Sequence, residues 1–411
     1  MNGITQEPPV AISSSAPAGY VPLAAACLAL ALLWSAAVPP EAGAIAAWTR
    51  EYNTECTTCH TPFPHRNEFG EAFRRNGYVW PGRTPADKPV NAPEGYWLSG
   101  IPTTLPLSVS ARFRFDYDPE LEDDKVTSAT DLQLHAGGSI RNKIGFFAHD
   151  LTGSAEAFAV YRHLQGTPIN LRFGRLIPQT TLWRENQGFT ASLQAPLAFS
   201  VAGGGGPLTA PRDAVELNAV LAKRLFLAAG VGDRRGQDTM EFFGHLSCKI
   251  GGADFLGNQP DVDFDVDSLW DFLSLTLSTY GYGGRIEQNT YDTDFYRIGA
   301  EAEVLYRAWT VLFSGVFGHD DDVDGNGLEV DSVVWMGEVN YFFAPNYSVT
   351  LRYENEDVGN APDGIVKRVI GNVAYIPFET VILRFEGRYV RSQSDDDPTN
   401  VGGLFQTIIH F

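Results

Sequence analysis

The feature that most constrains this chain is a period-two alternation of apolar and polar residues that begins at Leu105. From Leu105 to Tyr117 every odd position is apolar, and the even positions are Pro, Ser, Arg or Asp. Successive side chains of a β-strand point to opposite faces. The pattern therefore predicts a strand with one apolar face and one polar face.

The alternation recurs through residues 105–411 in about sixteen segments, roughly one per 19 residues, a spacing typical of transmembrane β-barrels with ~10-residue strands. The sequence ends on an aromatic segment, Phe405 to Phe411, as such barrels commonly do. We therefore predict a mostly β fold in which residues 101–411 form a transmembrane antiparallel β-barrel of about 16 strands. A soluble β-sandwich or propeller is the alternative, and the length of the alternation argues against it.

Composition excludes two classes of protein. The chain has 50 acidic and 30 basic residues, a net charge of −20, and a nucleic-acid binder needs a basic face instead. A polytopic helical membrane protein needs repeated apolar runs of ~20 residues, whereas this sequence has a single apolar run of that kind, Val21 to Val38. We therefore expect no nucleic-acid partner.

The same apolar run indicates export. It is followed by Pro39, Pro40 and the small-residue pattern Ala42-Gly43-Ala44, which predicts a signal peptide over residues 1–44. The first twenty residues contain no Lys or Arg, unlike most signal peptides, and an uncleaved anchor helix is the alternative. An exported β-barrel belongs in the bacterial outer membrane, where we expect lipid to surround it.

One motif carries chemistry. Residues Cys56-Thr57-Thr58-Cys59-His60 have the C-x-x-C-H spacing of a c-type haem attachment site. Two thiols bond to the vinyl groups of one porphyrin, and the adjacent His60 is the proximal iron ligand. We therefore expect residues 45–100 to form a small cytochrome c segment with one covalent haem c on Cys56 and Cys59.

Two other interpretations of this motif are weaker. A redox C-x-x-C motif is expected in a βαβ context, and a structural zinc site needs a second Cys/His pair. Only His65 lies close in sequence. The residues that follow, Asn67–Asn76, predict a short helix with Asn67 as its N-cap and Gly77 just beyond its C-terminus.

The sixth iron ligand is not evident in the sequence. No Met occurs between Met1 and Met240, so a nearby His/Met pairing is excluded. His135 lies on the polar phase of its predicted strand, which faces the barrel lumen, and is the first candidate for the distal ligand. The other candidates are His65, His149 and His163, and an open site is a further alternative. The polar phase also contains arginines suited to haem propionates: Arg112, Arg114, Arg141 and Arg172.

Acidic runs fall between the predicted strands, where we expect loops. The runs are Glu120–Asp124, Asp261–Asp267, Asp320–Asp324 and Asp395–Asp397. They are either ordinary solvated loops or an anionic mouth that concentrates cations. The run from Asp320 to Gly325, with Asp331 at the twelfth position, also partly resembles a Ca²⁺-binding loop.

The motif and its surroundings resemble the fused outer-membrane monohaem cytochrome c–porin family, the surface iron-oxidising cytochrome type. The match covers Cys56 to Pro62, then Asn67, Phe69, Gly70 and Phe73, then Asn76-Gly77-Tyr78. That family often has Pro-Lys-Leu-Asn where this chain has Pro64-His65-Arg66-Asn67. The resemblance implies electron transfer from extracellular Fe(II), or another donor, through one haem to a periplasmic cytochrome.

Three functions therefore follow from the sequence. The first is an electron conduit across the outer membrane, in which the chain is an iron(II)-oxidising cytochrome or a plain electron carrier. The second is a porin or channel with a structural or regulatory haem. The third is a haem peroxidase-like enzyme, which needs an open iron site with an acid/base His nearby.

Overall fold

The computed structural model describes residues 47–61, 65–84, 106–119, 125–149, 156–183, 188–234, 240–260, 273–287, 291–359, 364–393 and 400–410. The expected signal peptide, residues 1–44, lies outside these ranges. Residues Ile45–Phe411 form one compact unit, so the motif segment and the barrel are described together. Among the described residues, no helix combines the length and apolar character that crossing a membrane requires.

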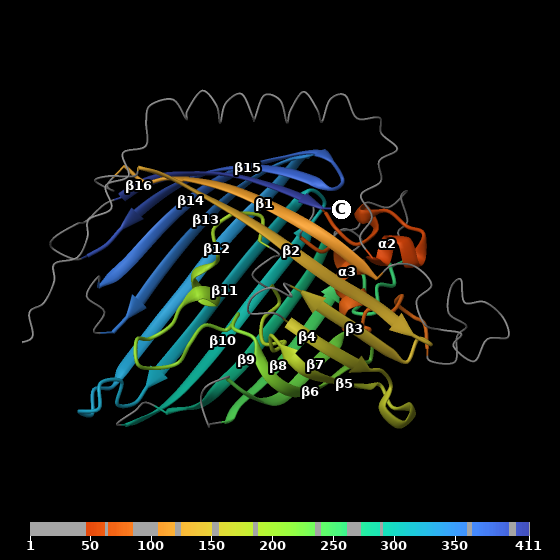
Figure 1. Ribbon diagram of the computed structural model, residues 1–411, viewed down its shortest axis with the longest axis horizontal. Helices are drawn as coiled ribbons and strands as arrows, with labels where there is room; N and C mark the ends of the chain where they lie inside the picture. The colour runs from red at the N-terminus through yellow and green to blue at the C-terminus, as the bar shows by residue number, and fades with distance from the viewer. Residues whose placement is uncertain are drawn as a thin grey trace, which may run out of the picture. The chain divides into compact units, whose positions relative to one another are not determined.

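A closed antiparallel barrel dominates the structure (Figure 1). Each strand pairs with its neighbours in sequence, and β1 closes the barrel by pairing with β16, where Ser110 lies opposite His410. The predicted barrel of about sixteen strands is therefore confirmed. Within the described residues the strands are β1 (Leu107–Tyr117), β2 (Val126–Ile140), β3 (Ile144–His149), β4 (Glu156–Tyr161), β5 (Ile169–Leu176), β6 (Arg212–Leu221), β7 (Leu225–Asp233), β8 (Met240–Gly251), β9 (Leu273–Glu287), β10 (Asp292–Tyr306), β11 (Trp309–Asp320), β12 (Val330–Ala344), β13 (Tyr347–Val358), β14 (Ile365–Phe378), β15 (Val381–Arg391) and β16 (Asn400–His410).

The two faces of the barrel wall differ as the alternation predicts. Apolar side chains of the outward face stay exposed, among them Ile298 at 57% and Leu351 at 61%. On the inward face Glu216 and Arg352 are fully buried at 0% exposure. A soluble sheet packs its apolar face inward, so this inside-out arrangement is that of a barrel whose outer surface meets hydrocarbon.

The arginines expected inside the barrel divide into two groups. Arg112 and Arg114 share the inward phase of β1, and Arg172 of β5 is buried with its guanidinium 2.7 Å from Glu216. Arg141 instead lies in the turn between β2 and β3, with a φ of 51°. The expectation of a strand position was wrong for Arg141, because the chain reverses direction immediately after Ile140.

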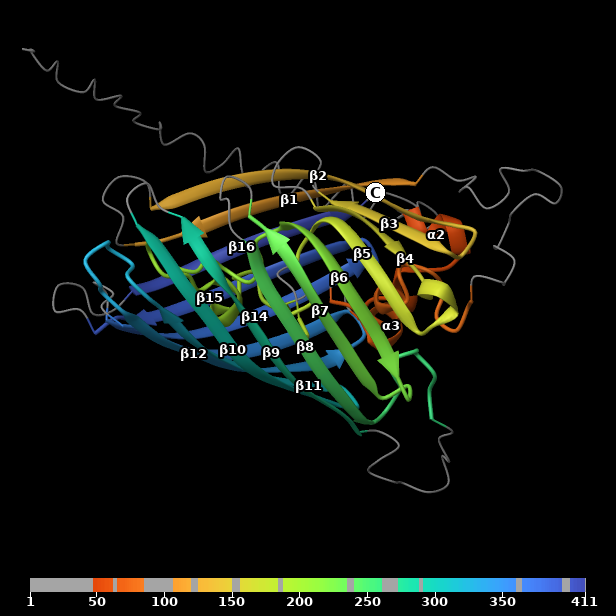
Figure 2. The same cartoon turned by 90° about the horizontal axis from the view of Figure 1, so that it is seen from below.

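The barrel has two distinct ends, which we name by their connections. At the turn end, strands are joined by residues 141–143, 162–168, 222–224, 252–272, 307–308, 345–346 and 379–380. At the loop end, they are joined by residues 118–125, 150–155, 177–211, 234–239, 288–291, 321–329, 359–364 and 392–399. Strand β16 finishes at the turn end, where the helices that precede the barrel also lie (Figures 1 and 2).

The described residues 47–61 and 65–84, here called the plug segment, contain α2 (Ala47–Tyr52), the 3₁₀ turn η1 (Cys56–Thr58) and α3 (Glu68–Arg75). The predicted helix is confirmed, since Asn67 caps α3 by accepting the N–H of Gly70 at 2.9 Å. Gly77 follows with a φ of 68°, a left-handed conformation that glycine adopts without strain.

The plug segment packs against the inward face of the barrel at the turn end. The ring of Trp48 stacks on Tyr78 and on Phe147 of β3, with centroid distances of 5.0 and 5.9 Å. On another part of the wall, Lys249 of β8 forms an ion pair with Glu68 at 2.7 Å. These contacts attach the plug segment to two separate parts of the wall, five strands apart, at the turn end of the lumen.

A second segment fills the lumen from the loop end. The described residues 177–183 and 188–211, here called the inner loop, connect β5 to β6 and include α4 (Ala195–Ala198). Inward-facing carboxylates accept its backbone N–H groups: Glu301 from Leu182 at 2.6 Å and Glu354 from Ala195 at 2.9 Å. The remaining helical element, η2 (Leu164–Gly166), lies in a connection at the turn end.

Candidate functional site

The motif residues form a single helical turn. The N–H of His60 donates to the carbonyl of Cys56 at 3.0 Å, and the N–H of Cys59 donates to the same carbonyl at 3.1 Å. Residues i, i+3 and i+4 of a helical turn lie on one face. The turn therefore presents Cys56, Cys59 and His60 on a common face, as attachment of one porphyrin requires.

Contacts with α3 hold this turn in place. The side-chain amide of Asn67 donates to the carbonyls of Thr57 and Thr58 at 3.2 and 3.1 Å. Gly70 of α3 approaches the turn so closely that a Cβ at this position would lie 2.1 Å from the carbonyl oxygen of Cys59. A side chain at position 70 would push α3 away from the motif, which explains the need for glycine.

The two thiols of the motif are not joined to each other, because Cys56 and Cys59 form no disulfide. Burial, with the charge of Glu379, raises the pKa of the Cys56 thiol to about 11. Burial raises the pKa of the Cys59 thiol to about 11 as well, against the opposing charge of Arg66. Both thiols are therefore protonated at neutral pH in the folded chain.

Three histidines of the barrel wall gather on the inward face at the turn end. His135 of β2 lies opposite His149 of β3, with ring centroids 4.7 Å apart, and the ring of His410 of β16 lies 6.2 Å from His135. His60 is within electrostatic range of His410. The fold thus brings the first distal candidate, His135, into the same neighbourhood as the motif histidine. We call His135, His149 and His410 the wall histidines.

Hydrogen bonds orient the rings of two wall histidines. Nε2 of His135 lies 2.8 Å from Oγ of Ser110, and Nε2 of His149 lies 3.0 Å from Oε1 of Gln133. Ser110 and Gln133 are themselves opposite one another in the β1–β2 pair. The rings are therefore fixed by neighbouring inward-facing side chains.

The structure places the two other distal candidates elsewhere. His65 is buried in the plug segment, and its ring lies 4.8 Å from Trp183 and 4.2 Å from Phe189 of the inner loop. His163 lies in the turn between β4 and β5, outside the strands, with a φ of 52°. His65 thus joins the plug segment to the inner loop. Because His163 lies outside the strands, the alternation of strand faces does not direct its side chain into the lumen.

His410 was missed by the sequence reasoning. The signal was present, because Phe405, Thr407 and Ile409 take the apolar phase of the final strand and so give position 410 the lumenal phase. What the sequence lacks is the closure of the barrel. Only the β1–β16 pairing, with Ser110 opposite His410, places this last strand beside the first two.

A cavity of about 600 Å³, lined by both charged and apolar side chains, lies between the plug segment and the barrel wall. Its wall combines cationic and anionic groups of the plug segment with those of the barrel, and the inner loop closes one side through Trp183. Residues that line it include Thr58, Arg66, Glu71, Lys249, Glu303 and Arg307. The charges of Arg66, Arg74 and Arg75 overcome the effect of burial and hold the pKa of Glu71 well below its usual range.

The donor set fits a covalently attached c-type haem. Two thiols and one imidazole occupy one face of a turn, which matches the attachment chemistry. The wall histidines supply further imidazoles in the same neighbourhood, and Arg112 acts electrostatically on His410 from within the lumen. Cys248 does not take part, since it is exposed on the outward phase of β8.

The acidic runs have different outcomes. Glu120–Asp124, Asp261–Asp267 and Asp395–Asp397 lie outside the described residues. In the fourth run, Asp320 is fully buried in the lumen, where its Oδ2 lies 2.9 Å from Nη1 of Arg297. The resemblance to a Ca²⁺ loop was therefore wrong, because its first carboxylate points into the barrel and away from the loop.

The fold and the inner loop define a porin-type barrel, and comparison with known proteins agrees. No family model and no curated protein matches the chain. Among solved structures it is similar to an anion-selective porin from Comamonas acidovorans, with 12% identity over 74% of this chain and 98% of that chain and a TM-score of 0.54. The outer membrane channel DcaP of Acinetobacter baumannii has 13% identity over 74% and 96%, with a TM-score of 0.50. OmpT of Vibrio cholerae has 11% identity over 75% and 99%, with a TM-score of 0.50.

Proposed function

We propose that this chain is an outer-membrane electron-transfer protein that holds one haem c in the turn end of a porin-type barrel. The observation that carries the proposal is the single turn with Cys56, Cys59 and His60 on one face, inside a closed barrel and close to the wall histidines. A bound haem c would supply a one-electron redox centre.

The residues have distinct roles in this proposal. Cys56 and Cys59 form the two thioether bonds, and His60 is the proximal ligand. His135, or a neighbouring wall histidine, is the candidate for the opposite side of the iron. Arg112 offers a guanidinium for a propionate, because Arg–carboxylate hydrogen bonds are charge-assisted and strong. Trp48 and Tyr78 of the plug segment stack with Phe147 of β3, next to His149, and give this region an apolar side.

The barrel supplies the path through the membrane. Its exposed apolar outer face suits a surrounding lipid layer, and the turn end, where β16 finishes, is assigned to the periplasm by analogy with porin-type barrels. Each extracellular Fe²⁺ gives up one electron and becomes Fe³⁺, and a periplasmic cytochrome accepts that electron. Carboxylates at the loop end attract the cationic donor.

Stopped-flow absorption spectroscopy of the purified protein in detergent tests this proposal. Addition of Fe²⁺ is expected to reduce the haem, and reduction is expected to require Cys56 and Cys59. If Fe²⁺ fails to reduce the haem at every pH at which the protein stays folded, Fe(II) is not the electron donor. In a second arm the haem is reduced with dithionite and mixed with a soluble periplasmic-type cytochrome. Failure to transfer electrons to that cytochrome would contradict the conduit, whichever donor reduces the haem.

A porin-like channel is the second candidate, and the shared fold is the observation that favours it. The plug segment and the inner loop both occupy the lumen, which argues against free passage of solutes. Planar bilayer recording decides between the two functions. The conduit predicts small or absent ion conductance with a reducible haem, whereas a channel predicts large, stable conductance whether the haem is oxidised or reduced.

A further inference from the structure

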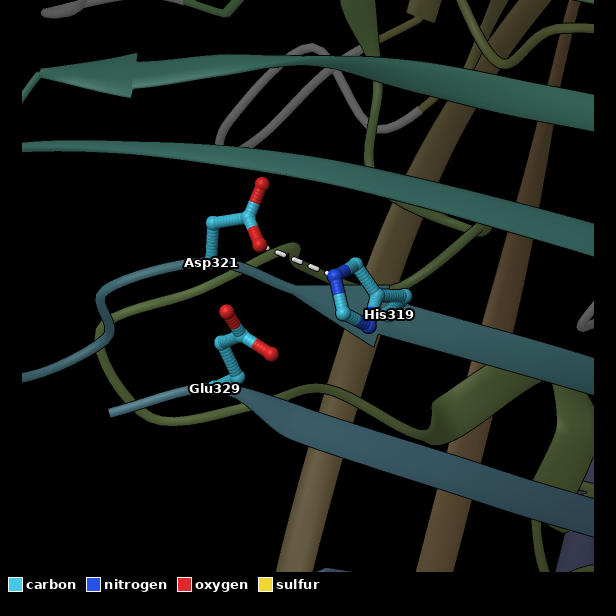
Figure 3. A group of neighbouring side chains, drawn as sticks. All are labelled: His319, Asp321 and Glu329. Atoms are coloured by element: carbon cyan, nitrogen blue, oxygen red, sulfur yellow. Dashed lines mark hydrogen bonds and ion pairs between the residues drawn. The ribbon is translucent and has the colours of Figure 1, made fainter. Parts of the chain in front are cut away.

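The outer rim of the loop end contains a cluster unrelated to the motif. His319 lies on the outward phase of β11, two residues after the exposed Phe317. Asp321 and Glu329 begin and end the connection to β12, so the hairpin brings them beside His319 (Figure 3). We call His319, Asp321 and Glu329 the rim cluster.

The donor atoms of the rim cluster converge. One nitrogen of His319 and one carboxylate oxygen each of Asp321 and Glu329 all lie within 4.8 Å of one another. Bonds of ~2.0–2.2 Å from a metal ion to N and O ligands place neighbouring donor atoms ~3–3.5 Å apart in a tetrahedral site. Small side-chain rotations are therefore enough to bring all three donors onto one ion.

A fourth residue orients the imidazole. Nδ1 of His319 lies 2.7 Å from Oδ1 of Asp331, which is its partner across the β11–β12 pair. A carboxylate only accepts hydrogen bonds, so both ring nitrogens donate a proton in the metal-free chain: Nδ1 to Asp331 and Nε2 to Asp321. A metal ion bound at Nε2 would replace the proton there, while Nδ1 would keep its bond to Asp331. The opposite nitrogen, Nε2, is directed at Asp321, whose Oδ1 is 2.9 Å away. A carboxylate behind an imidazole in this way is the usual outer-shell arrangement of a metal-binding histidine.

The ring position is also supported by packing. Tyr296 of β10 lies beside His319 with ring centroids 5.3 Å apart. The ion pairs of Asp321 and Asp331 are both with His319. Several carboxylates thus share one imidazole, and a cation would reduce their mutual repulsion.

The donor types select the kind of cation. Ca²⁺ and Mg²⁺ prefer sites built only from oxygen, whereas imidazole suits zinc, iron, nickel and copper. We propose that the rim cluster binds one divalent transition-metal ion, with His319, Asp321 and Glu329 as ligands and Asp331 as the positioning residue. This proposal is independent of the haem, because the rim cluster lies at the other end of the barrel and on its outer face.

Calorimetric titration of the haem-loaded protein in detergent with ZnCl₂ tests the proposal. Zn²⁺ has no redox chemistry, so the haem is not disturbed. We expect one saturable site that His319→Ala abolishes and that Glu329→Gln weakens. Asp331→Asn is expected to weaken it by about tenfold or more, as loss of an outer-shell partner does.

The matched control is Asp294→Asn. Asp294 lies at the same rim and loses the same charge, but its carboxylate is engaged by Arg285 at 2.7 Å, so Zn²⁺ affinity is expected to stay unchanged. The heat-modifiability assay, which compares the migration of heated and unheated samples on SDS gels, checks that each variant folds into the barrel. The proposal would be overturned if the His319→Ala variant bound Zn²⁺ with the same affinity as the unmodified chain. The choice of metal class would be overturned if Ca²⁺ displaced bound Zn²⁺ at concentrations similar to that of Zn²⁺ itself.

Discussion

The plug segment and the inner loop both fill the lumen, but by different interactions. The plug segment combines one ion pair to the wall with extensive aromatic packing: Phe73 and Tyr78 are buried, and the rings of Trp48, Tyr78 and Phe147 all stack against one another. The inner loop relies on charge-assisted hydrogen bonds, because wall carboxylates accept its N–H groups and wall arginines donate to its carbonyls. For example, the guanidinium of Arg384 donates to two inner-loop carbonyls, that of Thr190 at 2.8 Å and that of Gly188 at 3.0 Å.

The difference suggests separate tasks for the two segments. Apolar burial removes side chains from water and does not depend on ionised groups, which would suit the surroundings of the proposed haem. A charge-assisted network needs its carboxylates ionised and its partners in register, which suits a rigid barrier in a polar lumen. Substitutions that act on one segment and spare the other therefore test the comparison.

The largest expected effect comes from the motif. Replacing both thiols, Cys56→Ala with Cys59→Ala, is expected to abolish covalent haem completely, because no thioether bond can form. Haem staining after denaturing electrophoresis measures this directly. Cys248→Ala is the control, since that thiol is exposed on the outward face and staining should be retained. Haem that stays covalently bound without both motif thiols would contradict the attachment site.

The next effect tests the apolar packing of the plug segment. Phe73 is 5% exposed and contacts Trp48 and Tyr52 edge-on, so Phe73→Ala should cost ~3–5 kcal/mol through lost contacts and a residual cavity. Limited proteolysis in detergent should then cleave within the plug segment. Phe73→Leu conserves most of the volume and should cost less. If the Phe73→Ala variant resists protease as well as the unmodified chain does, packing at this position does not hold the segment.

The inner loop provides the matching polar test. Glu386 accepts the N–H groups of Ala191 and Ser192 at 2.7 and 3.1 Å, and Glu386→Gln should cost ~2–3 kcal/mol because a charged acceptor is lost. A loosened inner loop should raise ion conductance in planar bilayers. Glu356→Gln is the control, because Glu356 bonds to Arg368 and not to the inner loop. Unchanged conductance of the Glu386 variant would show that the loop is held by its other contacts.

The smallest effect is a pH dependence of the plug segment. Burial raises the pKa of Glu51 from 4.5 to about 7, against the hydrogen bond from Ser139. The folded state therefore favours the protonated acid, so its stabilisation is complete below pH ~4.5 and is lost as the pH rises to about 7. Thermal denaturation at pH 5 and pH 8 should show a loss of ~1–2 kcal/mol at the higher pH.

Glu51→Gln should remove that dependence, because the amide is neutral at both pH values. Glu55→Gln, an exposed neighbour in the same segment, should leave it unchanged. A pH dependence that is the same in both variants would assign it to other groups.

Much of the fold was predictable because its signals are local. The alternation from Leu105 to Tyr117 needs only neighbouring residues, and it correctly assigned Arg112 and Arg172 to the lumen. Asn67 and Gly77 marked the ends of α3 for the same reason. Arg141 was misplaced because a turn of three residues interrupts the alternation without a Gly or Pro to mark it.

The two sites differ in how far the sequence reveals them. Cys56, Cys59 and His60 form a contiguous motif, so the sequence alone predicts haem attachment there, and that assignment stays a prediction. The rim cluster could not be predicted from the sequence, because neighbouring residues around Asp320 have side chains on opposite faces of the barrel wall. Asp320 points into the lumen, whereas His319 and Asp321 point outward, and only the strand phase of β11 separates them.

The sequence by itself determined the barrel wall, its two faces and the haem-type motif, since each depends on residues close together in the chain. The tertiary structure decided what fills the lumen and which histidines meet. His135 and His410 are far apart in sequence and become neighbours only when β1 pairs with both β2 and β16, and the packing of the plug segment brings His60 within electrostatic range of His410. Barrel closure is a long-range event, and no local pattern of residues records it.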